Sequence, residues 1–195
     1  MKTEIEVKFC DIDIDAMREI LARAGAVCEQ PMRLMRRALI EEPHHTKDNA
    51  FLRIRDEGGR VTMTYKKFHD ESAIGGVREL EVQVSSFDDT VKLLELAGWP
   101  AVTYQESKRE TWRLSDVEVV VDEWPWIAPY VEIEGPSEER VRQVAEGLGF
   151  DWKDAVIGSV DVIYSKTFPN KINRGVIDIR EVRFDDPVPK EFIIK

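Results

Sequence analysis

Cysteine is scarce in this sequence: only Cys10 and Cys28 occur, and neither lies in a metal-binding or reactive motif. We expect both to be reduced, partly buried thiols, as is usual in a cytoplasmic protein. No apolar run is long enough to cross a bilayer, and no signal-peptide segment stands at the N-terminus. A glycine-rich loop followed by Lys and Ser or Thr is also missing, which excludes the usual nucleotide-binding loop. The sequence therefore predicts a cytoplasmic protein without a membrane partner.

Positive charge is in deficit as well, because the formal net charge of the 195 residues is -10. This balance argues against a general nucleic-acid or anionic-membrane surface. It leaves room for an anionic ligand, because local basic residues and metal ions can reverse the field inside a site. With 43% hydrophobic and 34% charged residues, and no linker rich in Pro, Gly or Ser, we expect one large globular domain or two small ones.

A carboxylate–apolar–carboxylate pattern occurs three times, at residues 4–6, 79–81 and 132–134. Side chains on a β-strand alternate between its two faces, so both carboxylates of each copy share one face. Each copy is followed by a turn and a helical stretch that ends near a glycine, which indicates a supersecondary unit used more than once. Three such strands can direct three pairs of carboxylates at one space.

The pattern of apolar residues predicts three main helices placed between hairpins of about eight antiparallel strands. We expect helices at residues 14–24, 88–97 and 137–148, a shorter helix within 152–165, and strands at residues 4–9, 32–40, 50–56, 61–67, 77–84, 117–123 and 129–133 and within 101–114. Residues 176–184 are a candidate for a further strand. Strands that alternate charged and apolar residues form either an open sheet with one wet face or a closed barrel with a polar interior. In the barrel, helices would cover the outward apolar faces.

If the charged faces converge, carboxylates and basic side chains enter one space. The acids are Glu4, Glu6, Glu79, Glu81, Asp122, Glu132 and Glu134, and the bases are Lys8, Arg36, Arg53, Arg55, Lys66 and Arg109. Carboxylates hold Mg²⁺ or Mn²⁺, while Arg forks and Lys charges suit phosphate oxygens. Such a set makes a site for a metal-bound polyphosphate. The alternative is a solvated sheet surface with interstrand ion pairs, and the pattern alone leaves both open.

Two basic pairs are divided by strand alternation, because neighbouring residues on a strand point to opposite faces. At most one of Arg36 and Arg37 can face the interior, and we predict that it is Arg36. The same choice arises for Lys108 and Arg109, where we predict Arg109.

Large aromatic side chains gather around Pro125, which Trp124 and Trp126 flank. Two tryptophans in such a position could stack on a base. Large aromatic residues more often fill a core, so we expect both to pack beneath the rim of the barrel.

Residues 4–8, Glu-Ile-Glu-Val-Lys, resemble the E-x-E-x-K signature of the CYTH superfamily, the triphosphate tunnel metalloenzymes. Later elements follow in a similar order: Leu52-Arg53-Ile54-Arg55, Thr64-Tyr65-Lys66, Arg78-Glu79-Leu80-Glu81, Lys108-Arg109, Asp122 and Glu132-Ile133-Glu134. The resemblance covers residues 1–165. It implies an α+β fold in which an eight-stranded antiparallel β-barrel forms a tunnel with a polar interior and helices pack on the outside. We expect this domain to span residues 1–168, with residues 169–195 as a C-terminal extension, either separate or part of the same domain.

The resemblance also assigns roles to the charged residues. The metal ligands would be Glu4, Glu6, Asp122, Glu132 and Glu134. The triphosphate-binding set would be Lys8, Arg53, Arg55, Lys66 and Arg109, to which we add Arg36. The catalytic residues would be Lys8, Glu79 and Glu81.

The activity implied by the resemblance is that of a metalloenzyme using Mg²⁺ or Mn²⁺. Its partner would be a small molecule that contains a triphosphate: inorganic triphosphate, ATP or thiamine triphosphate. Hydrolysis is the leading hypothesis. A class IV adenylyl cyclase would use the same residues to convert ATP to cyclic AMP and pyrophosphate, and a non-catalytic polyphosphate- or nucleotide-binding module is the third hypothesis. We expect a monomer or homodimer without a nucleic-acid partner.

Overall fold

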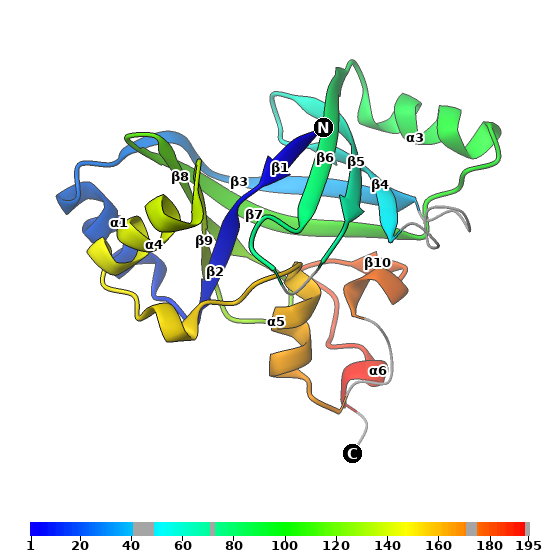
Figure 1. Ribbon diagram of the computed structural model, residues 1–195. Coiled ribbons are helices and arrows are strands. Elements are labelled where there is room, and N and C mark those ends of the chain that lie inside the picture. Colours follow the sequence, from blue (N-terminus) through cyan, green and yellow to red (C-terminus); the bar gives the residue numbers. More distant parts are fainter. Residues whose placement is uncertain (41–48, 71–72, 171–174, 194–195) are drawn as a thin grey trace.

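The computed structural model describes residues 1–40, 49–70, 73–170 and 175–193. Most of these residues belong to β-strands and to the helices packed on them (Figure 1). The strands are β1 (Lys2–Glu4), β2 (Glu6–Cys10), β3 (Val27–Ile40), β4 (Ala50–Asp56), β5 (Val61–Phe68), β6 (Val77–Val84), β7 (Thr103–Leu114), β8 (Val117–Glu123), β9 (Tyr130–Glu134) and β10 (Glu181–Val182). The helices are α1 (Ile14–Arg23), α3 (Phe87–Leu96), α4 (Glu138–Gly147), α5 (Val160–Thr167) and α6 (Lys190–Ile193), with 3₁₀ turns η1 (Trp152–Asp154) and η2 (Val176–Asp178).

The sheet curls into a nearly closed antiparallel barrel with strand order β1-β6-β5-β4-β3-β7-β8-β9-β2. β1 and β2 belong to one N-terminal segment that is interrupted only at Ile5. The first half of this segment pairs with β6 and the second half with β9, so it joins the two ends of the sheet. Counted as one broken strand, β1 and β2 give the barrel eight strands, as predicted.

The outward face of the N-terminal segment shows why helices cover this barrel. Val7 and Phe9 of β2 are buried in a core with Ile133 of β9, Leu21 of α1 and Val141 of α4. Their alternation with Glu6 and Lys8 sends the apolar side chains outward and the charged side chains inward. The prediction that helices cover the outward apolar faces is therefore confirmed.

The three main helices begin at polar caps. The side chains of Asp13, Ser86 and Ser137 each accept a hydrogen bond from a backbone N–H in the first turn of α1, α3 and α4. Such caps satisfy N–H groups that have no partner within the helix. α3 packs on the opposite part of the barrel from α1 and α4, with Phe87 and Val91 in a second core cluster.

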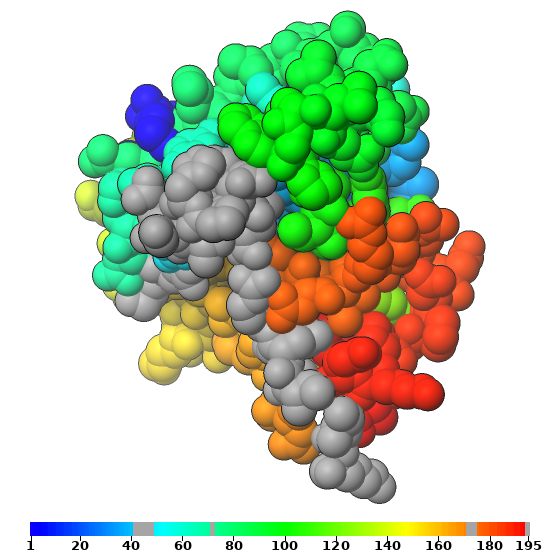
Figure 2. Space-filling model, turned by 90° about the vertical axis from the view of Figure 1, so that its right-hand side faces the viewer, coloured from blue at the N-terminus to red at the C-terminus, as the bar shows by residue number. Residues whose placement is uncertain are grey.

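The C-terminal segment, which comprises residues 152–170 and 175–193, differs from its prediction. The candidate strand at residues 176–184 is mostly wrong, because the structure has η2 followed by only the two residues of β10. β10 pairs in parallel with the N-terminal end of β7, at Tyr104 and Gln105. The helix expected within 152–165 is divided into η1 and α5. Figure 2 shows these C-terminal residues, orange to red, packed beneath α3 across the lower part of one face.

Aromatic residues hold the C-terminal segment against the barrel. Trp124, Tyr164 and Phe192 are buried in one cluster, and Trp126 packs against it. The Tyr164 hydroxyl donates a hydrogen bond of 2.6 Å to the Pro125 carbonyl. Both tryptophans therefore pack near the barrel end, as expected. Within the described residues, no helix is long and apolar enough to cross a membrane.

A matched pair of leucine substitutions tests the helix-covered core. Leu21 is fully buried, whereas Leu93 on α3 is 66% exposed. We expect Leu21→Ala to lower the free energy of unfolding by about 2–5 kcal/mol, because it leaves a cavity. Leu93→Ala should change it by less than about 0.5 kcal/mol. Urea denaturation followed by circular dichroism measures both, and equal losses would contradict this assignment of the core.

Candidate active site in the barrel

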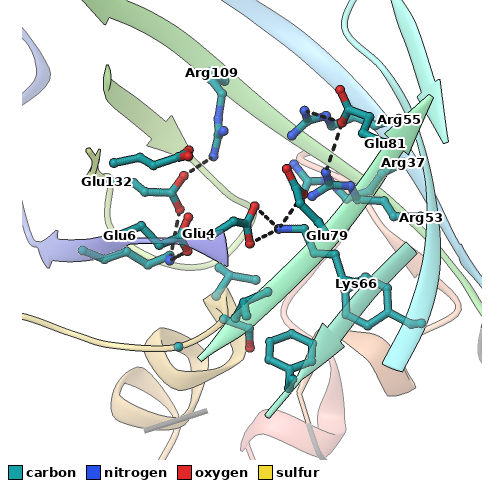
Figure 3. A pocket seen from close by; sticks show the side chains of 18 of the residues that line it. Glu4, Glu6, Arg37, Arg53, Arg55, Lys66, Glu79, Glu81, Arg109 and Glu132 are labelled. Atoms are coloured by element: carbon teal, nitrogen blue, oxygen red, sulfur yellow. Dashed lines mark hydrogen bonds and ion pairs between the residues drawn. The ribbon is translucent and has the colours of Figure 1, made fainter. Parts of the chain in front are cut away.

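The barrel encloses a polar cavity of about 980 Å³. Charged side chains from strands on all sides of the barrel line it, and Figure 3 shows many of them pointing toward one another. The sequence-predicted residues on its wall are Glu4, Glu6, Lys8, Arg53, Arg55, Lys66, Glu79, Glu81, Arg109, Glu132 and Glu134. The alternation that predicted an inward charged face is thus confirmed for these positions.

Arg37, and not Arg36, faces the cavity. Arg37 lies opposite Arg55 of β4 and is buried, whereas Arg36 is exposed and pairs with Asp56 on the outside at 2.7 Å. The prediction that Arg36 faces the interior was therefore wrong. Residues 38–40 are all apolar, so they gave no alternation from which to choose between the two arginines.

Asp122 lies behind Arg109 and does not line the cavity wall. Its two oxygens accept hydrogen bonds from Arg109 Nε at 2.7 Å and Nη2 at 2.5 Å. The two residues are opposite each other on β7 and β8, which places this bidentate pair. In this arrangement Asp122 orients the Arg109 guanidinium, and its role as a metal ligand stays a prediction.

Lys8 lies between two carboxylates on one side of the cavity. Its Nζ is 2.6 Å from Glu6 Oε1 and 3.0 Å from Glu132 Oε2. Burial raises the pKa of Glu6, and the nearby charge of Glu132 raises it further. Burial alone would raise the pKa of Glu132, but Lys8 and Arg109 outweigh it and hold that pKa below its usual range. Two carboxylates thus share one lysine, and the negative charge of Glu6 is the less well compensated of the two.

Lys66 of β5 makes a similar contact with acids of β1 and β6. Its Nζ donates to both oxygens of Glu4 at 2.8 Å and is 3.6 Å from Glu79 Oε2. Glu79 Oε2 is buried without a hydrogen bond among the described residues. It remains available to accept one from a ligand or water.

Three arginines form the opposite, positively charged side of the cavity: Arg37, Arg53 and Arg55 (Figure 3). The Nε atom of each is buried and has no hydrogen-bond partner within the described residues. Glu81 lies 4.0 Å from Arg53 and 3.9 Å from Arg55, and Arg55 Nη2 is also paired with Glu57 Oε1 at 2.6 Å. Burial, followed by the charges of its arginine neighbours, lowers the pKa of Arg37 to about 9. Burial and then Arg55 lower the pKa of Arg53 to about 10.

Arg37 and Arg53 remain protonated near neutral pH, and among the described residues Arg37 has no ion-pair partner, so the protein does not fully neutralise the charge on this side of the cavity. Unpaired guanidinium N–H groups in a buried cluster are suited to the oxygens of a phosphate group. The walls formed by β3 and β4 therefore carry donors of the kind that an anion requires.

The carboxylate side of the cavity offers oxygen donors, which are the ligands that suit a hard divalent cation. Glu4, Glu6, Glu132 and Glu134 all line the wall, and Mg²⁺ and Mn²⁺ prefer such oxygen ligands. The described residues contain no ready-made cluster of three acidic, histidine or cysteine side chains. The carboxylate oxygens on this wall form ion pairs with Lys8, Lys66 and Arg109 in this arrangement.

The protein is thus a nearly closed antiparallel barrel in which acidic and basic side chains face one cavity. A family model for the CYTH domain matches residues 2–152. The chain belongs to the CYTH family.

Solved structures show the same fold at low sequence identity. A conserved protein from Pyrococcus furiosus is 23% identical with a TM-score of 0.67, and the match covers 79% of this chain and 95% of that one. A candidate adenylate cyclase from Vibrio parahaemolyticus is 14% identical with a TM-score of 0.72, covering 84% and 98%. A candidate adenylyl cyclase from Hippeastrum, described as having a dominant triphosphatase activity, is 16% identical with a TM-score of 0.52, covering 74% and 85%. No curated protein sequence matches the chain significantly.

The melting temperatures of two arginine variants test the charge balance of the cavity. Arg37 has no acidic partner among the described residues, whereas Arg18 is paired with Glu110. We expect Arg37→Met to leave the melting temperature of the ligand-free protein unchanged or raised, because it removes a buried charge repelled by Arg53 and Arg55. Arg18→Met should lower it by about 3 °C or more, because the Glu110 carboxylate would lose its charged partner and keep the Trp112 N–H. Arg18 Nη2 is 2.8 Å from Glu110 Oε2, and that carboxylate side chain is 5% exposed.

Differential scanning calorimetry without added phosphate compares the two variants with the wild type. A larger loss of melting temperature in Arg37→Met than in Arg18→Met would contradict the electrostatic description of the cavity.

Proposed function

We propose that the protein is a metal-dependent triphosphatase that hydrolyses a triphosphate-containing small molecule in the barrel. The observation that carries this proposal is the pairing of three buried guanidinium groups, each with an unpaired Nε, with a carboxylate wall in one cavity. A molecule with several adjacent phosphates, bound together with a divalent cation, presents the complementary charges to both walls.

Substrate binding would rest on the arginine side. Arg37, Arg53 and Arg55 offer planar N–H forks to phosphate oxygens, and Arg109 is held for the same purpose by Asp122. Their positive charge also stabilises the negative charge that shifts between phosphate oxygens during transfer. Because they are fixed within a folded barrel, they need little rearrangement at the moment of reaction.

The carboxylates Glu4, Glu6, Glu132 and Glu134 would hold Mg²⁺ or Mn²⁺. When bound, such an ion supplies Lewis-acid polarisation of phosphoryl oxygens. Lys8 stays protonated beside them, because Glu132 and Glu6 raise its pKa despite its burial. Lys8 is therefore a fixed cation beside the reacting phosphate and not a proton acceptor.

Glu79 and Glu81 are the acids placed to orient the attacking water. Thr64 Oγ1 donates to Glu81 Oε2 at 3.0 Å, and Arg60 Nη2 donates to Glu81 Oε1 at 2.5 Å. Glu79 Oε2 has no hydrogen-bond donor among the described residues, so it is the oxygen free to accept a hydrogen bond from the attacking water. We assign the water-orienting role to Glu79. Glu81 would instead position the guanidinium groups of Arg53 and Arg55.

The rival activities share this cavity. A class IV adenylyl cyclase would bind ATP through the same charged residues, and the fold likeness to the Hippeastrum protein, described as having a dominant triphosphatase activity, favours hydrolysis. A pure binding module has little use for so many carboxylates facing a phosphate site. We assign residues 1–168 to the catalytic domain and residues 169–195 to an extension of the same domain, because Val176 and Ile177 line the cavity.

Product analysis tests the proposal directly. The purified protein would be incubated with inorganic triphosphate, ATP or thiamine triphosphate, with Mg²⁺ or Mn²⁺, and the products followed by phosphorus NMR. We expect orthophosphate from at least one substrate, no turnover in EDTA, and recovery when the metal is restored. Cyclic AMP with pyrophosphate from ATP would move the assignment to a cyclase, and binding without any turnover would identify a binding module.

A carboxamide substitution tests the carboxylate wall. We expect Glu6→Gln to lower kcat at least about 100-fold, since the variant loses a proposed metal ligand. Its melting temperature should equal or exceed that of the wild type, because burial and Glu132 disfavour the charged form of Glu6. Glu146→Gln, on the exposed face of α4, is the control and should keep full activity. Wild-type turnover by Glu6→Gln would overturn the proposed site.

A further inference from the structure

Trp124 lies at the end of the cavity that the C-terminal segment covers. Its side chain lines the cavity together with Val176 and Ile177 and is only 4% exposed. Its indole Nε1–H is buried and has no hydrogen-bond partner among the residues that the structure describes. A donor buried in this way is unfavourable unless something else provides an acceptor.

Two other tryptophans of the chain show the ordinary arrangement. Trp112 donates its Nε1–H to Glu110 Oε1 at 2.7 Å, and Trp126 donates its own to the Asp186 carbonyl at 2.7 Å. Neither of these side chains lines the cavity. The unpaired indole donor thus coincides with the one of these three tryptophans that faces the cavity.

The neighbour of Trp124 also has an unpaired donor. The Arg37 guanidinium carbon lies 4.3 Å from the centroid of the Trp124 ring, which is a cation–π contact. Arg37 Nη2 donates to Ser107 Oγ at 2.8 Å, but Arg37 Nε has no partner within the described residues. Two buried N–H groups of adjacent side chains are therefore without acceptors in the same part of the cavity.

Packing fixes the Trp124 ring in this position. Tyr164 contacts it edge-on, with ring centroids 6.4 Å apart, and the Tyr164 hydroxyl is bound to the Pro125 carbonyl. The ring therefore cannot turn easily toward another acceptor. Besides burial, the charges of Arg53, Arg55 and Arg109 lower the pKa of Arg37, and the charge of Asp122, which raises it, offsets them only in part, so positive charge predominates around Arg37. An anionic oxygen is the acceptor that satisfies both the geometry and the charge.

We propose that Trp124 Nε1–H and Arg37 Nε–H bind oxygens of one phosphate group, the group nearest the C-terminal segment. This subsite rests on the proposed triphosphate function and extends it, because it assigns an indole donor to substrate recognition. Trp124 then has two roles: its ring holds the plane of Arg37, and its N–H binds the phosphate.

The test is Trp124→Phe, which keeps an aromatic ring beside Arg37 and removes the N–H donor together with part of the indole. Loss of one hydrogen bond to a charged oxygen should raise KM for inorganic triphosphate with Mg²⁺ by about 10-fold. Trp126→Phe is the matched control, because it also removes an indole donor from the same aromatic cluster but outside the cavity. Its KM should stay within about 2-fold of the wild-type value, well below the loss of one such bond.

Indole N–H resonances give a readout independent of turnover. In ¹⁵N-labelled protein, the Trp124 resonance is assigned by its absence from the spectrum of Trp124→Phe. Addition of inorganic triphosphate in EDTA should shift it downfield and leave the Trp126 resonance in place. An unchanged Trp124 resonance together with an unchanged KM in Trp124→Phe would overturn the subsite. The acceptor of the indole N–H would then be a buried water molecule.

The two proposals fail in different ways. A wild-type protein that hydrolyses no triphosphate, but whose Trp124 resonance shifts on adding triphosphate, would refute the triphosphatase and retain the subsite. A wild-type protein that hydrolyses triphosphate, with Trp124→Phe indistinguishable from it in KM and with no shift of the indole resonance, would refute the subsite alone.

Discussion

Strand alternation inside a nearly closed barrel is the constraint on which the rest of this structure depends. Every second side chain of each strand must point into a confined space, and in this chain many of those side chains are charged. Many of the remaining side chains are apolar and point outward, and α1, α3 and α4 bury a large part of them. The same alternation thus produces both the core, which lies outside the barrel, and the charged cavity within it.

The charges in the cavity are not evenly neutralised. Lys8 and Lys66 are each within ion-pair distance of two carboxylates, whereas Arg37 has no acidic partner among the described residues. This separation leaves positive charge on the β3 and β4 walls and competing carboxylates on the β2 and β9 walls. Such an arrangement costs stability in the free protein, and active sites commonly retain charge of this kind because a ligand compensates it.

The C-terminal segment links the cavity to the outer aromatic cluster. Thr103 of β7 donates to the Ile179 carbonyl at 2.6 Å, and the backbone of Tyr104 donates to the Arg180 carbonyl at 2.9 Å. The segment is thereby fixed to the barrel wall, and its residue Val176 reaches the cavity. Trp124 lies between the two regions, with one face toward Arg37 and an edge contact with Tyr164.

The sequence by itself determined the barrel strands, the main helices and most of the charged cavity wall, because period-two alternation and helix caps are local properties. It could not choose between Arg36 and Arg37, since residues 38–40 are uniformly apolar. Only the tertiary structure decided that choice, because pairing with Arg55 of β4 fixes the register of β3. Barrel closure likewise decided that Lys8 lies between Glu6 and Glu132, because β2 and β9 meet only when the two ends of the sheet join.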